Sequence, residues 1–103
     1  MTDRELIKLA KEFRRGILGN RDNSKGWCAA ISWPLESLLS LHGIEAALVE
    51  TNLSSDSRSS EALNHVWLML PDGRALDPTA DQFDRTLGEV YLGSPLWFHG
   101  VTR

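Results

Sequence analysis

Three side chains of the kinds that work together in nucleophilic catalysis occur in the order Cys28, His65 and Asp77. Attack by a cysteine needs a thiolate, a base that takes the thiol proton, and a third group that orients the base. Cys28 is the only cysteine of the sequence, so it has no partner for a disulfide within the chain or for a zinc site built on several thiolates. It is therefore either a small buried side chain or a reactive group, and we interpret it as the candidate nucleophile.

The position of Cys28 favours a reactive thiol because a helix is expected to begin there. Apolar residues recur at helical spacing over 28–42, and Gly43 is typical of a C-terminal cap. Pro34 lies inside this segment, and the alternative is a helix that begins at Pro34 and leaves Cys28 in a loop. We favour one kinked helix, because apolar positions on both sides of the proline share a stripe. At its start, unpaired N–H groups and the helix dipole favour a thiolate.

His65 is the best placed of the three histidines to act as the base. It opens the segment 65–70, whose alternation and β-forming residues predict a strand, and a strand is a rigid platform for a catalytic group. His42 stands at the expected end of a helix, where a histidine usually caps carbonyl groups. His99 lies four residues from the end of the sequence. We therefore interpret neither of these two as the base.

Asp77 is the candidate orienting group, and the length of a hairpin loop decides whether it shares a face with His65. A two-residue loop would place Leu68 opposite Asp77 and turn Asp77 away from His65. A three-residue loop over 71–73 pairs Trp67 with Asp77, which makes His65 and Asp77 diagonal neighbours on one face. The loop sequence is proline, aspartate and glycine, which is typical of a type I turn with a G1 bulge. The turn chemistry therefore favours the register that brings the two side chains together.

The other expected elements surround this hairpin in a single domain, 1–103, because the length suits one domain. They are a helix over 3–18, a strand over 44–51, a polar loop over 54–60, a second hairpin strand over 74–77, and one or two edge strands over 87–98. The helix begins with a capping box at Thr2–Glu5. We expect the polar loop to be mobile and to act as a lid. We divide the domain into an N-terminal helix and loop (1–25), a core that carries the candidate site (26–82), and C-terminal strands and tail (83–103).

Charge is unevenly distributed along the chain, whose formal net charge is −3. Residues 1–25 hold seven Lys and Arg against four acidic side chains, and the remainder is acidic. We interpret the basic residues as a solvated helix face rather than a nucleic-acid surface, because no aromatic residues are interleaved with them. No apolar run is long enough to cross a bilayer and no secretory signal opens the sequence, so we expect a cytoplasmic protein without nucleic-acid or membrane partners.

Three acidic residues, Asp77, Asp81 and Asp84, follow one another closely enough to raise the question of a metal site. Their spacing does not match that of a calcium-binding loop, and acids after a proline more simply begin a short solvated helix. We therefore expect no metal and no cofactor.

Four segments, taken in order, resemble the transglutaminase-like branch of the papain-like cysteine enzymes: Gly26-Trp27-Cys28, Leu38-Leu39-Ser40-Leu41-His42-Gly43-Ile44, Asn64-His65-Val66-Trp67 and Leu76-Asp77-Pro78-Thr79. The resemblance covers about residues 26–82. It implies an α+β fold with a minimal papain-like core, in which the nucleophile helix packs on a small antiparallel sheet. It also implies that Cys28 is the nucleophile, His65 the base and Asp77 the orienting residue.

The expected activity is that of a cysteine hydrolase or acyltransferase that acts on amide bonds of a peptide or protein substrate through a covalent acyl-thioenzyme. Peptidases, deamidases and transglutaminases all fit this description. Asn23, Asn20 and Gln82 are the candidates for a second donor to the oxyanion, and Asn23 is favoured. The alternative is a catalytically inactive binding or adaptor domain of the same fold, and the oligomeric state is open in either case.

Overall fold

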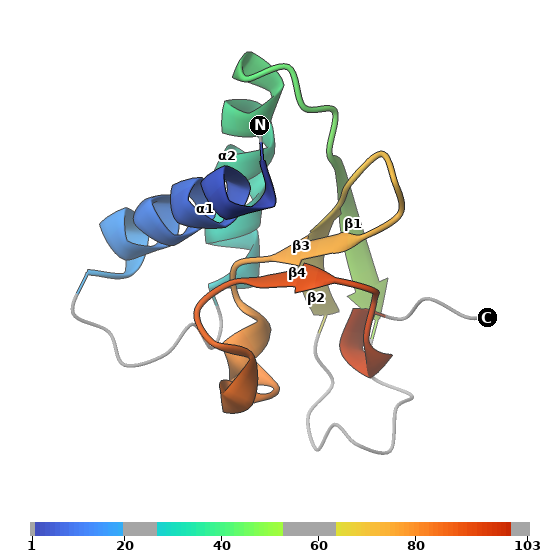
Figure 1. Ribbon diagram of the computed structural model, residues 1–103. Coiled ribbons are helices and arrows are strands. Elements are labelled where there is room, and N and C mark those ends of the chain that lie inside the picture. Colours follow the sequence, from blue (N-terminus) through green and yellow to red (C-terminus); the bar gives the residue numbers. More distant parts are fainter. Residues whose placement is uncertain (1, 20–26, 53–63, 100–103) are drawn as a thin grey trace.

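The computed structural model describes residues 2–19, 27–52 and 64–99 (Figure 1). These residues form two α-helices and one antiparallel sheet of four strands in the order β1-β2-β3-β4, which confirms the expected α+β class. The helices are α1 (Asp3–Leu18) and α2 (Cys28–Leu41), and the strands are β1 (Ala47–Asn52), β2 (Asn64–Met69), β3 (Ala75–Asp77) and β4 (Tyr91–Gly93). Three short 3₁₀ helices are η1 (Ala80–Gln82), η2 (Arg85–Leu87) and η3 (Trp97–His99).

Helix α1 begins at the expected capping box. The Thr2 hydroxyl accepts the backbone N–H of Glu5, and the Glu5 carboxylate accepts the backbone N–H of Thr2. Together these bonds satisfy two of the donors that a helix start leaves unpaired. One face of the helix is buried, at Leu6, Ala10 and every fourth residue after them as far as Leu18.

Helix α2 runs from Cys28 to Leu41 without interruption, with Pro34 inside it. The prediction of one helix through the proline is therefore confirmed, and the alternative of a helix that begins at Pro34 is wrong. The helix ends as expected, because Gly43 has a φ of 79° and Ile44 donates its backbone N–H to the Leu39 carbonyl at 2.9 Å. Neither helix in the described part of the chain is long and apolar enough to cross a membrane.

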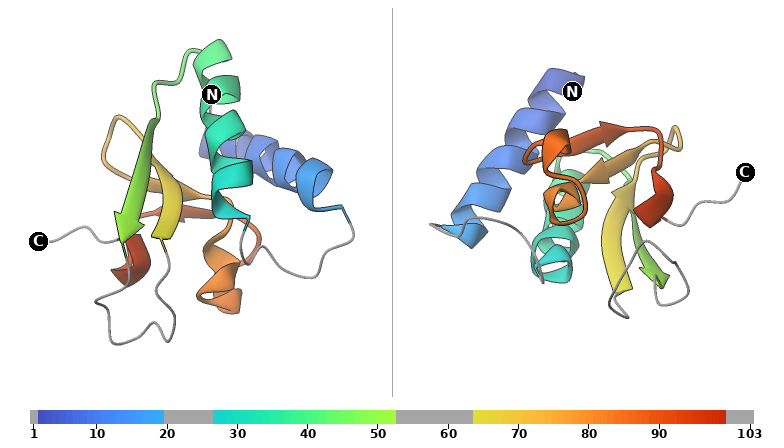
Figure 2. Two further views of the ribbon diagram at one scale, coloured as in Figure 1. Left: turned by 180° about the vertical axis from the view of Figure 1, so that it is seen from behind. Right: turned by 90° about the horizontal axis from the view of Figure 1, so that it is seen from below.

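The two helices lie on the same side of the sheet (Figure 2). Because side chains alternate along a strand, one set of strand residues points to the helices and the other set points away from them. The main core lies between helices and sheet and consists of buried apolar residues: Leu6, Ala10, Leu35, Leu39, Leu68, Leu70, Leu76 and Val90. His65, Trp67 and Asp77 belong to the other set, and the opposite face that they form is covered by η3.

The hairpin between β2 and β3 has the expected register. Leu68 pairs with Leu76, and the Leu70 N–H donates to the Arg74 carbonyl at 2.8 Å, which leaves a loop of three residues. Gly73 adopts a φ of 89°, and its N–H donates to the Leu70 carbonyl. The three-residue alternative is therefore confirmed and the two-residue alternative is wrong.

The ends of the other elements differ in detail from expectation. The first strand begins at Ala47, three residues later than predicted, and the C-terminal region contributes one strand, β4, in which Tyr91 lies opposite Asp77. The polar loop over 54–60, with its expected mobility and lid role, lies outside the described residues.

Because the backbone at Gly73 is left-handed, an alanine there should affect stability differently from an alanine at Gly16. An added Cβ meets no atom within 4 Å at either Gly73 or Gly16, but Gly16 lies inside α1 without a positive φ. Gly73→Ala should therefore lower the free energy of unfolding by about 1–2 kcal/mol, the penalty for a left-handed side-chain residue. Gly16→Ala should raise it by about 0.5–1 kcal/mol. Urea unfolding measures both, and shifts of equal sign contradict this reading of the hairpin.

Candidate active site

Cys28 is the first residue of α2, and its side chain is half-buried. The N-cap residue is Trp27, whose indole has no oxygen that accepts the first N–H groups of the helix. Burial alone would raise the pKa of the Cys28 thiol. Hydrogen bonds from His65 and from the backbone of Val66 and Ala29, together with the charge of His65, nevertheless bring that pKa below its usual value. The thiolate is thus favoured chiefly by His65, with smaller contributions from backbone N–H groups, one of which, that of Ala29, belongs to the start of α2.

His65 is fully buried near the start of β2, and its two ring nitrogens face different partners. Nε2 lies 2.6 Å from the Asp77 Oδ2 atom, so the ring's other nitrogen, Nδ1, is left to bond with the Cys28 thiol. Burial lowers the pKa of the imidazolium, but the hydrogen bonds with Asp77 and Cys28 outweigh it and raise that pKa to about 9. The lowered pKa of the thiol and the raised pKa of His65 together favour transfer of the thiol proton to the imidazole.

Asp77 ends β3 and has no access to solvent. Its Oδ1 accepts the backbone N–H and the hydroxyl of Thr79, at 2.9 and 3.2 Å, and its Oδ2 faces His65. Burial alone would raise the pKa of this carboxyl, but hydrogen bonds from His65 and His99 lower it to about 2. The structure therefore brings together Cys28, His65 and Asp77, the three residues selected from the sequence.

A second histidine, His99 of η3, also bonds to Asp77, and the sequence analysis missed it. Its Nε2 lies 2.8 Å from the same Oδ2 atom that faces His65, and the side chain is fully buried. The sequence signal was weak, because no periodic pattern precedes His99. Its two apolar neighbours, Trp97 and Phe98, were the available indication that this segment turns inward.

Of the three candidate oxyanion donors, the structure brings Gln82 to the site. The Gln82 amide nitrogen lies 3.4 Å from His65 Nδ1, on the side of the ring that faces the thiol, and donates to the Thr79 hydroxyl at 3.2 Å. Asn20 and the favoured Asn23 lie outside the described residues.

Arg14 fastens α1 to the segment that follows Asp77. Its side chain is buried and forms a bidentate pair with Asp81, at 3.0 and 2.7 Å. It also donates to the carbonyls of Pro78 at 3.0 Å and Glu89 at 2.6 Å. The expectation that the basic residues of 1–25 form a solvated face is therefore wrong for Arg14, and Asp81 belongs to an ion pair rather than to a solvated helix start.

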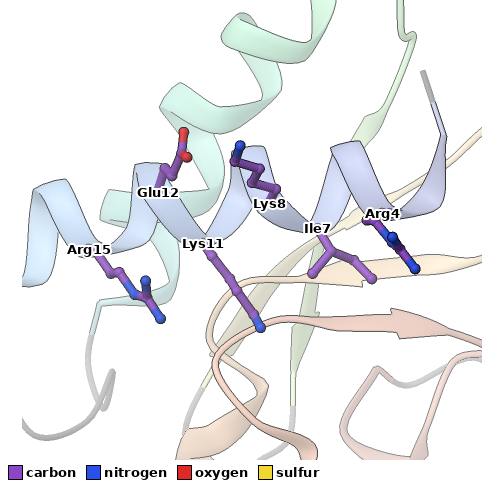
Figure 3. A pocket seen from close by; sticks show the side chains of 6 residues that line it. All are labelled: Arg4, Ile7, Lys8, Lys11, Glu12 and Arg15. Carbon is purple, nitrogen blue, oxygen red and sulfur yellow. The ribbon is translucent and has the colours of Figure 1, made fainter.

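The other side of α1 is open to solvent. A hollow of about 340 Å³ lies there. Figure 3 shows the side chains that line it: Arg4, Ile7, Lys8, Lys11, Glu12 and Arg15. Arg15 forms a bidentate pair with the carboxylate of Glu89, at 2.9 and 2.5 Å. Because acidic and apolar side chains interrupt the basic ones, this side matches the expected solvated face.

The described residues contain one group of side chains with the composition of a metal site: His65, Asp77 and His99. Tetrahedral zinc bonded at about 2.0–2.1 Å to two ligands holds them about 3.3 Å apart. The Asp77 Oδ2 atom lies only 2.6 Å from one imidazole nitrogen and 2.8 Å from the other. These are the distances of hydrogen bonds to a charged acceptor, so the arrangement suits shared protons rather than a metal ion.

The geometry provides a thiol that is easily ionised, an imidazole that accepts its proton, and a buried carboxylate that fixes the imidazole. No family model, curated protein or solved structure matches the chain.

The depressed pKa of Asp77 predicts how stability depends on pH. The carboxyl titrates at about 2 in the folded chain and near 3.8 when unperturbed, so its ionisation stabilises the fold by about 2 kcal/mol at neutral pH. Because the folded value is the lower one, this contribution is complete above about pH 5 and is lost as the pH falls towards 2.

Urea unfolding at pH 6 and at pH 2 should therefore show a loss about 2 kcal/mol larger in the wild type than in Asp77→Asn. The matched control is Glu45→Gln, which removes an exposed carboxylate between α2 and β1 and should keep the pH dependence of the wild type. Equal losses in the wild type and Asp77→Asn contradict the prediction.

Proposed function

We propose that the protein is a cysteine hydrolase or acyltransferase that acts on amide bonds through an acyl-thioenzyme. One observation carries the proposal: the Cys28 thiol, at the start of a helix, bonds to an imidazole whose far nitrogen is held 2.6 Å from a buried carboxylate. This order of nucleophile, base and orienting group is what acyl transfer by a thiolate requires.

In the proposed reaction, the Cys28 thiolate attacks the carbonyl carbon of the amide, and the C–O double bond becomes an oxyanion. His65, which holds the former thiol proton on Nδ1, passes it to the leaving amine as the C–N bond breaks. The acyl group then remains on sulfur as a thioester. Water or a second amine attacks this thioester, His65 takes a proton from the attacking group, and the thiol is regenerated with release of the acid or the new amide.

Asp77 takes no proton in this scheme. Its carboxylate bonds to Nε2–H of His65, which leaves Nδ1 for the thiol and stabilises the imidazolium that forms. The oxyanion would be met by the backbone N–H of Cys28 at the helix start and by the amide of Gln82, which lies beside the same imidazole nitrogen.

We further propose that the chain is a member of the transglutaminase-like branch of the papain-like enzymes, with a peptide or protein as substrate and the cytoplasm as its compartment. The order of the motifs around Cys28, His65 and Asp77 supports this assignment. The packing of α2 on an antiparallel sheet agrees with a minimal papain-like core.

The state of the thiol tests the proposal directly. Because Cys28 is the only cysteine, alkylation by iodoacetamide reports on this residue alone. The wild type should titrate below the usual thiol pKa, while His65→Ala should titrate near the ordinary value of about 8.5 or above, since the bond to the imidazole is lost. The matched control is His42→Ala, which removes an exposed histidine at the end of α2.

If the pKa of the Cys28 thiol is ordinary in the wild type and unchanged in His65→Ala, the enzyme proposal is wrong and the inactive adaptor is favoured. An equal shift in His42→Ala would show that the effect does not belong to the site.

Covalent capture tests the reaction and separates its two outcomes. Incubation with libraries of peptide amides and esters should add an acyl mass to Cys28, and Cys28→Ala should gain none. Asp77→Asn should acylate on the order of 10³–10⁴-fold more slowly, because its amide favours the wrong tautomer of His65. Addition of a labelled primary amine should then give either the amide, as in an acyltransferase, or only the acid, as in a hydrolase. No acyl adduct on any library member contradicts both.

A further inference from the structure

We propose that His99 is a positioning residue of this site, one that holds the Asp77 carboxylate and shares its negative charge with His65. The inference rests on the proposed function, because His99 acts through Asp77 on His65, which is the base of that reaction. Both imidazoles approach a single oxygen, Oδ2, at 2.6 Å from His65 and 2.8 Å from His99. Two imidazole donors therefore share one carboxylate oxygen.

The tautomer of His99 follows from its second hydrogen bond. The backbone N–H of Leu96 donates to His99 Nδ1 at 2.8 Å, so this nitrogen carries a lone pair and no proton. The ring proton must then be on Nε2, where it points to a carboxylate that can only accept. His99 is thus held as a neutral donor, whereas His65 has its Nδ1 free to exchange a proton with the thiol.

The His99 ring is packed among aromatic side chains. Its centroid lies 4.7 Å from that of Trp67 and 4.4 Å from that of Phe98, and it stacks on Tyr91. Its backbone is also fixed, because the Thr51 hydroxyl donates to the His99 carbonyl at 2.8 Å and accepts the indole N–H of Trp67 at 3.0 Å. A donor held this firmly keeps the carboxylate in position before any substrate arrives.

The shared oxygen has an electrostatic consequence for His65. The groups that act on its imidazolium are the thiol from α2 and the Asp77 carboxylate from β3, while the carboxylate is in turn stabilised by His99 from η3. Tyr91 of β4 stacks on His99 on the same face. Without the Nε2–H donor of His99, the carboxylate is a stronger acceptor for His65 alone. His65 then holds its proton more tightly and releases it less readily to a leaving amine.

The test is the titration of His65, followed by ¹⁵N NMR of labelled histidine in the wild type and three variants. His99→Phe keeps a ring but removes the donor, and it should raise the pKa of His65 by about half a unit or more. His99→Gln restores an N–H near the position of Nε2 and should recover most of the shift. Phe98→Leu trims the ring that packs on both histidines, and it should lower stability without moving the titration.

A shift that is absent in His99→Phe, or equally large in Phe98→Leu, overturns the proposal and leaves His99 with a purely structural role. If His99→Phe does not fold, the wild type and His99→Gln still decide. The wild-type spectrum must show His99 as the neutral tautomer protonated on Nε2, and a proton on Nδ1 at neutral pH overturns the proposal. These readouts do not depend on acyl transfer. A failure of the proposed function therefore appears in the alkylation and capture experiments, and a failure of this inference appears only in the titration.

Discussion

The negative charge of Asp77 lies out of contact with water, and the arrangement of the whole sheet face follows from that constraint. A buried carboxylate without partners costs several kcal/mol, so it must collect donors from its surroundings. Asp77 obtains them from β2, from η3 and from Thr79 just beyond its own strand. Each donor ties its element to Asp77, and in the short η3 helix this bond adds to the apolar packing of Phe98 and Trp97.

The buried positive charge of Arg14 on α1 also stabilises this arrangement. Arg14 binds the carbonyl of Pro78 and the carboxylate of Asp81, so the chain directly after Asp77 is bonded to α1. The carboxylate is therefore fixed twice, by donors to its oxygens and by restraint of its backbone. Such rigidity is what a preorganised polar site requires, since its groups do not have to reorient when charge moves.

The parts of the site that depend on local rules were predictable from the sequence. The Pro-Asp-Gly loop determines the hairpin register, and that register alone places His65 and Asp77 on one face. The helix start at Cys28 was likewise readable from spacing. The role of His99 was not predictable, because a hydrogen bond between η3 and β3 produces no periodic pattern in the sequence.

Arg14 is an instructive intermediate case. It was grouped with the solvated basic residues because of its charge, yet it occupies the buried stripe of α1 together with Leu6, Ala10 and Leu18. A charged residue on an apolar stripe indicates a buried partner, although the sequence does not say which one. Position along the helix was here a better guide than residue type.

The long reach of Arg14 also matters for the order in which the chain is synthesised. Its partners lie 64 to 75 residues further along, so at about 5–20 residues per second they leave the ribosome roughly 3–15 s after it does. During that interval the sheet on which α1 packs is incomplete, because β3 and β4 come late in the chain, and a helix of this length is only marginally stable alone in water. The last donor to Asp77 arrives later still. Assembly around the thiol is therefore a late event of biosynthesis, and Cys28 spends the preceding seconds as an ordinary, largely protonated thiol.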